Sequence, residues 1–163
     1  MLLDDALRAL PLLRAHPGDI VDVGSGGGSP GIPLALELPD RPFVLVEAER
    51  RKADFLRTHA PQNVEVVWGR AEEQPVERYG VALAKALAGP ATAVEWLLPL
   101  VEVGGIAIFW LGPSADLDLV TRVATQVGGG EPEVRDGLVV VPKLERAPGF
   151  PRRIGVAKKR PLR

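Results

Sequence analysis

Four glycines occur within five consecutive positions of the segment DVGSGGGSPGIP, residues 22–33. The apolar run DIVDV, residues 19–23, leads into them and is typical of a buried strand. Ser29 is placed to act as the N-cap, and Pro30 as the first residue, of a helix that ends near Leu38. A strand, a glycine-rich loop and a helix in this order form the start of a nucleotide-binding βαβ unit.

Further strands and helices alternate along the rest of the chain. The predicted strands are residues 43–47, 64–68, 81–85 and 105–111, and the predicted helices are residues 49–59, 91–100 and 115–127. Asp136-Gly137 lies between Glu133-Val134-Arg135 and the apolar run LVVV, as expected of a hairpin turn. This alternation predicts the α/β fold class, with a mostly parallel Rossmann-like sheet, helices on both faces and a C-terminal antiparallel hairpin.

The glycine loop does not match the common phosphate-binding motifs. In the dinucleotide pattern G-x-G-x-x-G/A, counted from Gly24, the third small residue falls on Ser29, and Pro30 follows it. Proline has no N–H, so this helix start has one fewer donor for a phosphate. The Walker pattern is absent because no Gly-Lys-Ser/Thr follows the glycines.

The pattern Asp-x-Gly-x-Gly-x-Gly instead resembles the first motif of class I S-adenosylmethionine-dependent methyltransferases. Its residues here are Asp22, Gly24, Gly26 and Gly28. That cofactor has no phosphate, and glycines allow the backbone to approach its methionine and ribose parts. Asp22 is placed to meet the cationic end, directly or through water. Glu47 ends the second predicted strand, where a carboxylate accepts hydrogen bonds from ribose hydroxyls.

Composition restricts the chemistry further. The 163 residues fit one domain, and the chain has no cysteine and only two histidines. Disulfides, a cysteine nucleophile and cysteine or histidine metal sites are therefore not expected. No apolar run reaches the roughly 18 residues of a membrane span, and we expect a cytoplasmic protein with neither membrane nor metal partners.

Positive charge gathers at the C-terminus. From Lys143 onward there are eight basic residues and one acidic residue, although the whole chain has 20 Lys and Arg against 21 Asp and Glu. Such asymmetry suggests a polyanion-binding segment, and a solvated tail lying on an acidic surface is the alternative. We therefore expect a methyltransferase domain over residues 1–143 and a basic tail over residues 144–163.

Successive blocks of the chain resemble the glucose-inhibited division protein B family, which methylates guanine N7 in small-subunit ribosomal RNA. The blocks are DVGSGGGSPGIPLAL, VEAERRKADFLR, GRAEE, LAKALAGP, PLVEVGGIAIFWLG and FPRRIGVAKKRPL. They extend from about Ile20 to the C-terminus, and the most specific of them is the basic, proline-containing ending. Compared with that family, we expect this chain to be short at its N-terminus.

The resemblance implies roles for particular residues, with S-adenosylmethionine as the cofactor and ribosomal RNA or the small ribosomal subunit as the partner. Lys85 would lie near the methyl-transfer site. The implied cofactor-binding residues are Asp22, Gly24, Ser25, Gly26, Gly28, Glu47, Ala48, Arg70, Ala71 and Glu72, with the last three near adenine. The implied RNA-binding residues are Arg152, Arg153, Lys158, Lys159 and Arg160.

The residues that are absent agree with N7 as the target. Guanine N7 has an in-plane lone pair and no proton, so its methylation requires alignment rather than a general base. A pyrimidine C5 enzyme would need a cysteine. Enzymes that methylate exocyclic amines commonly carry Asn/Asp-Pro-Pro-Tyr/Phe after the fourth strand, where this chain has Ala84-Lys85-Ala86-Leu87.

Four positions depart from the family pattern. Lys85 replaces an arginine, Gly80 an aspartate, Ser29 an aromatic residue and Leu111 a lysine. Two alternative functions therefore remain at this level. One is a non-catalytic or diverged RNA-binding or ribosome-assembly protein, and the other is a small-molecule methyltransferase.

Overall fold

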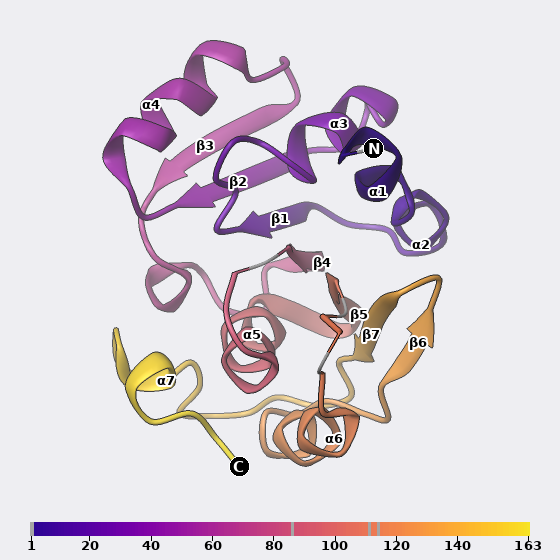
Figure 1. The fold of residues 1–163 in the computed structure, drawn as a ribbon, viewed down its shortest axis with the longest axis vertical. Helices are drawn as coiled ribbons and strands as arrows, with labels where there is room; N and C mark the ends of the chain where they lie inside the picture. Colours follow the sequence, from indigo (N-terminus) through magenta and orange to yellow (C-terminus); the bar gives the residue numbers. More distant parts are fainter. Residues whose placement is uncertain (1, 86, 111, 114) are drawn as a thin grey trace.

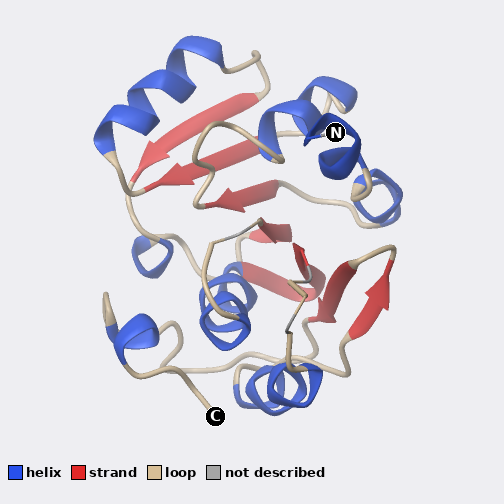
Figure 2. Cartoon of the chain, viewed as in Figure 1, coloured by secondary structure: helices blue, strands red, loops and turns tan. Residues whose placement is uncertain are grey.

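The glycine loop follows the first strand of a seven-stranded sheet in the computed structural model, which describes residues 2–85, 87–110, 112–113 and 115–163. The strands are β1 (Ile20–Val23), β2 (Phe43–Glu47), β3 (Val64–Trp68), β4 (Tyr79–Ala84), β5 (Val101–Trp110), β6 (Glu133–Arg135) and β7 (Leu138–Pro142). The α-helices are α1 (Leu2–Leu7), α2 (Leu10–Ala15), α3 (Gly31–Glu37), α4 (Arg50–His59), α5 (Pro90–Leu97), α6 (Leu117–Gln126) and α7 (Val156–Lys159). Two short 3-10 helices, η1 (Ala71–Glu73) and η2 (Leu98–Leu100), complete the elements (Figure 2).

The strand order is β3-β2-β1-β4-β5-β7-β6 (Figure 1). Strands β1 to β5 pair in parallel, whereas β7 is antiparallel to both β5 and β6. The chain order reverses between β1 and β4, and ligands of open α/β sheets bind at the carboxyl ends of the strands at such a switch point. The predicted mostly parallel sheet with an antiparallel end is confirmed.

The two faces of the sheet are buried under different helices. Strand residues Ile20 and Leu45 join the core cluster that contains Leu13, Leu34 and Leu56 of α2, α3 and α4. Their neighbours on the strands point to the opposite face and join a second cluster with α5 and α6. Successive side chains of a strand alternate between faces, so strands that are apolar throughout require helices on both sides.

The predicted hairpin is confirmed at Asp136-Gly137, which connects β6 to β7. Both residues have positive φ angles, 50° and 75°, as a two-residue type I′ turn requires. Most element boundaries shift by a few residues. The predicted strand 105–111 begins earlier, at Val101, and its last predicted residue, Leu111, lies outside the described residues.

The predicted helix cap at Ser29 is wrong. Helix α3 begins at Gly31, with Pro30 at the N-cap position. The carboxylate of Asp22 replaces the serine, because Asp22 Oδ2 accepts a hydrogen bond of 3.1 Å from the N–H of Gly31. A side chain from the end of β1 therefore caps the first turn of the helix.

The residues after Lys143 pack against the sheet and its helices. Ala147, Phe150 and Leu162 contact the core cluster beneath α5 and α6, and α7 lies beside α5. In the view of Figure 1 this segment passes between α5 and α6 on its way to α7. Lys143 itself is buried, and its Nζ donates a hydrogen bond of 3.1 Å to the carbonyl of Leu98. Among the described residues, no helix is long and apolar enough to cross a membrane.

Candidate cofactor site

The glycine loop turns sharply at the end of β1 and is bonded to β2. The N–H groups of Gly24 and Ser25 both donate to the carbonyl of Val46, at 2.8 and 3.2 Å. Gly24, Gly26 and Gly28 have φ angles of 71°, 53° and 104°. Side-chain-bearing residues rarely adopt such angles, so the three predicted glycines are explained by the backbone path that the loop takes.

Asp22 supports this loop from below. Its side chain is 1% exposed, and Oδ1 has no hydrogen-bond partner. Burial raises the pKa of Asp22 to about 7, an effect that the hydrogen bond from Gly31 partly offsets. The sequence suggested direct or water-mediated contact between Asp22 and the cationic end of a cofactor. In the structure Asp22 instead lies under the start of α3 and is not among the residues that line the cavities described below.

Glu47 connects the end of β2 to the glycine loop. Its Oε2 accepts a hydrogen bond of 2.8 Å from the N–H of Gly26, and its Oε1 accepts one of 3.0 Å from the N–H of Glu49. The side chain is only 8% exposed. Each carboxylate oxygen has two lone pairs, so each can accept a second hydrogen bond from a ligand. Two fixed backbone donors thus hold the carboxylate at the mouth of the site.

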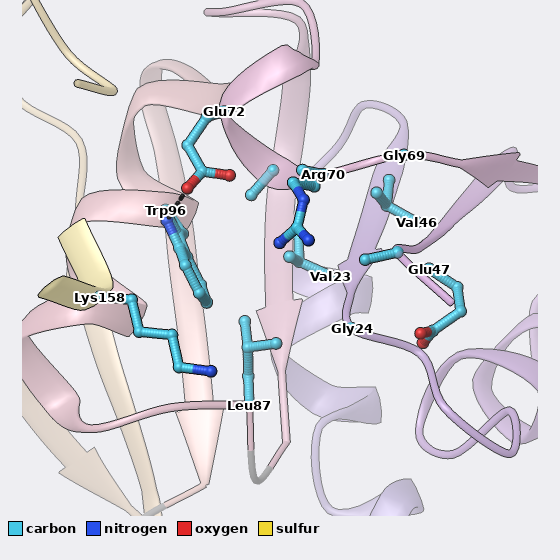
Figure 3. Close-up of a pocket in the computed structure, with 12 residues that line it drawn as sticks. Val23, Gly24, Val46, Glu47, Gly69, Arg70, Glu72, Leu87, Trp96 and Lys158 are labelled. Atoms are coloured by element: carbon cyan, nitrogen blue, oxygen red, sulfur yellow. Dashed lines mark hydrogen bonds between the residues drawn. The ribbon is translucent and has the colours of Figure 1, made fainter. Parts of the chain in front are cut away.

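A cavity of about 180 Å³ opens at the carboxyl ends of β1, β2 and β3 (Figure 3). Its lining includes six of the predicted cofactor residues, which come from three successive strand ends: Gly24, Glu47, Ala48, Arg70, Ala71 and Glu72. Ala48 is held by the indole of Trp68, whose Nε1 donates to the Ala48 carbonyl at 3.0 Å. These predicted residues therefore meet in one place, although up to 48 positions separate them in sequence.

A second, wider cavity of about 550 Å³ lies over the glycine loop. Gly24, Glu47 and Leu87 line both cavities, which are therefore adjacent. Ser25, Gly26, Gly27 and Ser29 line only the wider one. A Cβ atom on Gly27 would meet nothing within 4 Å, whereas one on Gly24 would collide with the Leu87 side chain. The loop thus presents open backbone at Gly27, whereas the Leu87 side chain packs on Gly24 where the two cavities adjoin. Gly28 lines neither cavity, because it packs against Ile32.

The turn after β3 forms the far wall of the smaller cavity. Ala71 is buried, and Glu72 Oε1 accepts hydrogen bonds from the indole Nε1 of Trp96 at 2.9 Å and from the N–H of Gly155 at 3.3 Å. Figure 3 shows Glu72 above Trp96, with the Arg70 guanidinium pointing into the space beside them. Trp96 and Leu87 were not predicted, because nothing in their spacing separates a cavity-facing residue from a core residue.

Lys85 lies where β4 ends and lines the wider cavity. Its Nζ is buried, lies 2.5 Å from Asp5 Oδ2 of α1, and sits 5.8 Å from the centre of the Trp110 ring. The Lys85 ammonium, together with Arg8, lowers the pKa of Asp5. The predicted methyl-transfer residue is therefore beside the site, but its charge is directed toward the N-terminal helix.

The five predicted RNA-binding residues have different surroundings. The Arg152 guanidinium contacts the fully buried carboxylate of Glu95 through Nε and Nη2, at distances between 2.5 and 3.0 Å. This ion pair raises the pKa of Arg152 and corrects the expectation that its side chain faces RNA. Lys158 lines the smaller cavity, which the sequence did not predict. Arg153, Lys159 and Arg160 are exposed.

Gly80, which departs from the family pattern, has a structural explanation. A Cβ atom there would collide with the carbonyl oxygen of Pro17, and the N–H of Gly80 donates to the Asp19 carbonyl at 2.9 Å. An aspartate could not occupy this place without displacing the segment before β1. Ser29, another departure, has a buried hydroxyl without a partner. Leu111 lies outside the described residues.

Comparison with known proteins gives a consistent result. The family model of GidB, described as rRNA small subunit methyltransferase G, matches residues 1–127. The match includes the first 19 residues, which the motif resemblance did not cover. The chain is 33% identical to ribosomal RNA small subunit methyltransferase G of Moorella thermoacetica, over 99% of this chain and 76% of the relative. It is 38% identical to the protein of that name from Rubrobacter xylanophilus, over 100% of this chain and 74% of the relative.

Solved structures resemble the fold at low sequence identity. The antibiotic-resistance methyltransferase Kmr superposes with a TM-score of 0.62 at 18% identity, covering 85% of this chain and 93% of that one. The TYW2 protein of M. jannaschii, solved in complex with AdoMet, gives a TM-score of 0.60 at 13% identity, covering 76% of this chain and 65% of that one. These likenesses support the class I methyltransferase fold.

Proposed function

The chain belongs to the rRNA small subunit methyltransferase G family, S-adenosylmethionine-dependent enzymes of 16S ribosomal RNA, and we propose that it methylates N7 of a guanine in that RNA. Three further elements belong to this proposal: the roles of the individual site residues, contact between the basic tail and RNA, and the small ribosomal subunit as the partner. We also propose a cytoplasmic location, which is where an enzyme of ribosomal RNA would meet its substrate.

The observation that carries the proposal is the position of Glu47 against the glycine loop. One carboxylate oxygen is bonded to Gly26 in the loop, and both groups line the adjoining cavities at the switch point of the sheet. A carboxylate at the end of β2 suits the two hydroxyls of a ribose. The open backbone at Gly27 suits the amino acid part of S-adenosylmethionine. The cavity walls therefore fit a nucleoside with an amino acid attached.

The adenosine end is proposed to lie in the smaller cavity. Ala71 and Glu72 supply backbone and carboxylate groups at its far wall, and Val46, Leu87 and Trp96 supply apolar surface. Such a cavity, apolar with a few fixed polar groups, is typical of cofactor sites. The Leu87 side chain stands between the two cavities, where it helps to exclude water from the reacting atoms.

The chemistry requires few groups from the protein. S-adenosylmethionine supplies an electrophilic methyl group on a positively charged sulfur. Guanine N7 has a lone pair and no proton to remove, so the protein needs to align the base and exclude water rather than provide a general base. Lys85, at the end of β4, is the proposed residue beside the transfer site, and its ion pair with Asp5 fixes its position.

The proposed RNA contacts are the exposed cations of the tail. Arg153, Lys159 and Arg160 lie in or beside α7, which packs against α5 and carries Lys158 of the smaller cavity. Cations of this kind bind phosphates of any sequence and bring the RNA to the site, leaving the choice of base to the site itself.

The proposal is tested with small ribosomal subunits that lack the methyl group. Radiolabelled S-adenosylmethionine should label their 16S RNA, and fully methylated subunits serve as the control. Mild borohydride reduction followed by aniline should then cleave the RNA at the labelled guanine, since this treatment detects N7-methylguanine. Label without cleavage would place the methyl group on another atom. An absence of label, with S-adenosylhomocysteine binding intact, would exclude this RNA as the substrate.

A further inference from the structure

Building on the proposed function, we infer that the C-terminal segment 150–163 contributes Lys158 to the wall of the cofactor site, and that Lys158 couples cofactor binding to RNA binding. One carboxylate oxygen connects the cavity wall, α5 and the C-terminal segment. Glu72 Oε1, on the turn that borders the cavity, accepts both from Trp96 of α5 and from the backbone of Gly155 in the C-terminal segment. A change in the cavity at Glu72 therefore reaches the segment through a direct hydrogen bond.

The segment is fastened to α5 at two further points. Thr92 Oγ1 donates to the carbonyl of Ala157 at 3.2 Å, and Arg152 bonds to the buried Glu95. Arg152 Nη2 also donates to the carbonyl of Arg160 at 2.8 Å, closing the chain on itself around α7. Buried, charge-assisted contacts of this kind hold a short segment in one place. Helix α7 is thus one turn fixed beside the cavity.

That single turn carries side chains with two different surroundings. Lys158 lines the cofactor cavity, and in Figure 3 its side chain extends from α7 toward Leu87. Lys159, the next residue, is exposed, as Lys158 is, but it is not among the cavity-lining residues. Neighbouring residues of a helix point about 100° apart, so a phosphate held by Lys159 and a nucleoside packed against Lys158 act on the same rigid turn.

The expected coupling is positive. A cofactor that fills the cavity packs against the exposed Lys158 side chain and orders it on the fixed turn of α7 before RNA arrives, so that RNA bears less of the ordering cost when it binds. By thermodynamic reciprocity, bound RNA strengthens cofactor binding by the same factor. A factor of about fivefold is at the lower end of the range found for coupled sites.

The test measures a binding cycle by calorimetry, using S-adenosylhomocysteine with and without saturating 16S ribosomal RNA. We expect the wild-type protein to bind S-adenosylhomocysteine about fivefold more tightly when RNA is present. Lys158→Ala should weaken S-adenosylhomocysteine binding and bring this factor close to one. Its matched control is Lys159→Ala, which should weaken RNA binding and leave the affinity for S-adenosylhomocysteine alone unchanged.

A second variant tests the shared carboxylate without altering the tail. Trp96→Phe keeps an aromatic ring but removes the N–H that bonds to Glu72, and it should also reduce the coupling. Urea unfolding of each variant separates these effects from a loss of folding. If Lys158→Ala gives the wild-type coupling factor, the inference is overturned although the proposed function stands. If the wild-type protein fails to bind S-adenosylhomocysteine at all, the proposed function itself fails.

Discussion

The carboxylate of Glu47 accepts a 2.8 Å hydrogen bond from the backbone N–H of Gly26, which joins the end of β2 to the loop that follows β1. The residue proposed to bind a ribose and the loop proposed to hold the amino acid end are therefore one bonded unit. Loss of the carboxylate would alter the shape of the loop as well as remove a contact to the cofactor.

Glu47→Gln should weaken S-adenosylhomocysteine binding by at least about tenfold, because it removes charge-assisted hydrogen bonds. A glutamine has one acceptor oxygen and cannot serve both Gly26 and Glu49, so the free energy of unfolding should also fall by about 1–3 kcal/mol. Calorimetry and urea unfolding measure the two effects. Glu49→Gln is the control, since its exposed pair with Lys52 contributes less than about 1 kcal/mol. Unchanged affinity in Glu47→Gln would refute its role in the site.

Two neighbouring glycines should respond differently to alanine. Gly27 has no positive φ angle and open space around it, so Gly27→Ala should leave the melting temperature unchanged while its methyl group obstructs the cofactor. Gly28 has a φ of 104°, and a Cβ atom there would lie 2.7 Å from Ile32 Cδ1. Gly28→Ala should therefore cost about 1–2 kcal/mol of stability. The opposite ranking of the two melting temperatures would contradict the loop geometry.

The stability of the protein should depend on pH through Asp22. Burial raises the pKa of Asp22 to about 7 in the folded state, whereas the unfolded chain has the ordinary value near 4. The folded state binds this proton more tightly, so the contribution of Asp22 is present below about pH 4 and is lost as the pH rises to about 7. The loss amounts to as much as about 4 kcal/mol.

Asp22→Asn cannot titrate and should flatten this part of the profile. Urea unfolding at several values between pH 5 and 8 measures the slope for both proteins. Equal slopes in the wild-type protein and in Asp22→Asn would show that Asp22 does not titrate in this range.

Substitutions at the two ends of the Lys85–Asp5 ion pair should show whether Lys85 acts in methyl transfer or only holds α1 in place. Lys85→Met removes the charge beside the transfer site, and we expect the single-turnover rate of RNA methylation to fall at least about tenfold. Asp5→Asn keeps Lys85 and an acceptor oxygen, so its rate should remain within about twofold of the wild-type rate. Equal losses in the two variants would indicate that Lys85 acts only by holding α1 in place.

Adjacent arginines of the tail should have distinct effects. Arg152→Ala leaves the buried carboxylate of Glu95 without its cation and should cost about 3–5 kcal/mol of folding free energy. The exposed Arg153 should contribute less than about 0.5 kcal/mol to stability. Arg153→Ala should instead reduce the slope of log RNA affinity against log salt concentration by about 0.7–0.9, the range for one phosphate contact. An unchanged slope would remove Arg153 from the proposed RNA surface.

Features that depend on local chain geometry could be predicted from the sequence. The strand before Gly24, the hairpin at Asp136-Gly137 and the parallel sheet all follow from apolar periodicity and turn residues. The six predicted residues of the smaller cavity, between Gly24 and Glu72, follow largely from the resemblance to known methyltransferases. They lie together because the carboxyl ends of parallel strands meet at one edge of the sheet.

Features that depend on tertiary packing could not be predicted. By sequence, Lys143 and Arg152 belong to the cations of the C-terminal region. In the structure both bind groups within the protein: Lys143 donates to the carbonyl of Leu98, and Arg152 donates to the buried carboxylate of Glu95. The place of Asp22 in the sequence motif suits a ligand contact, yet its carboxylate instead accepts a hydrogen bond from the nearby N–H of Gly31. Lys158 faces the cavity only because contacts distant in sequence dock α7 against α5. Charge and spacing alone do not distinguish these outcomes.

The place of β7 between β5 and β6 bears on how the chain is completed during translation. Strand β5 ends at Trp110, yet its second neighbour, β7, begins only at Leu138. A nascent chain interrupted before that point exposes the whole unpaired edge of β5, from Ile106 to Trp110, to other chains. Premature termination between these strands should therefore yield aggregates rather than a smaller folded protein.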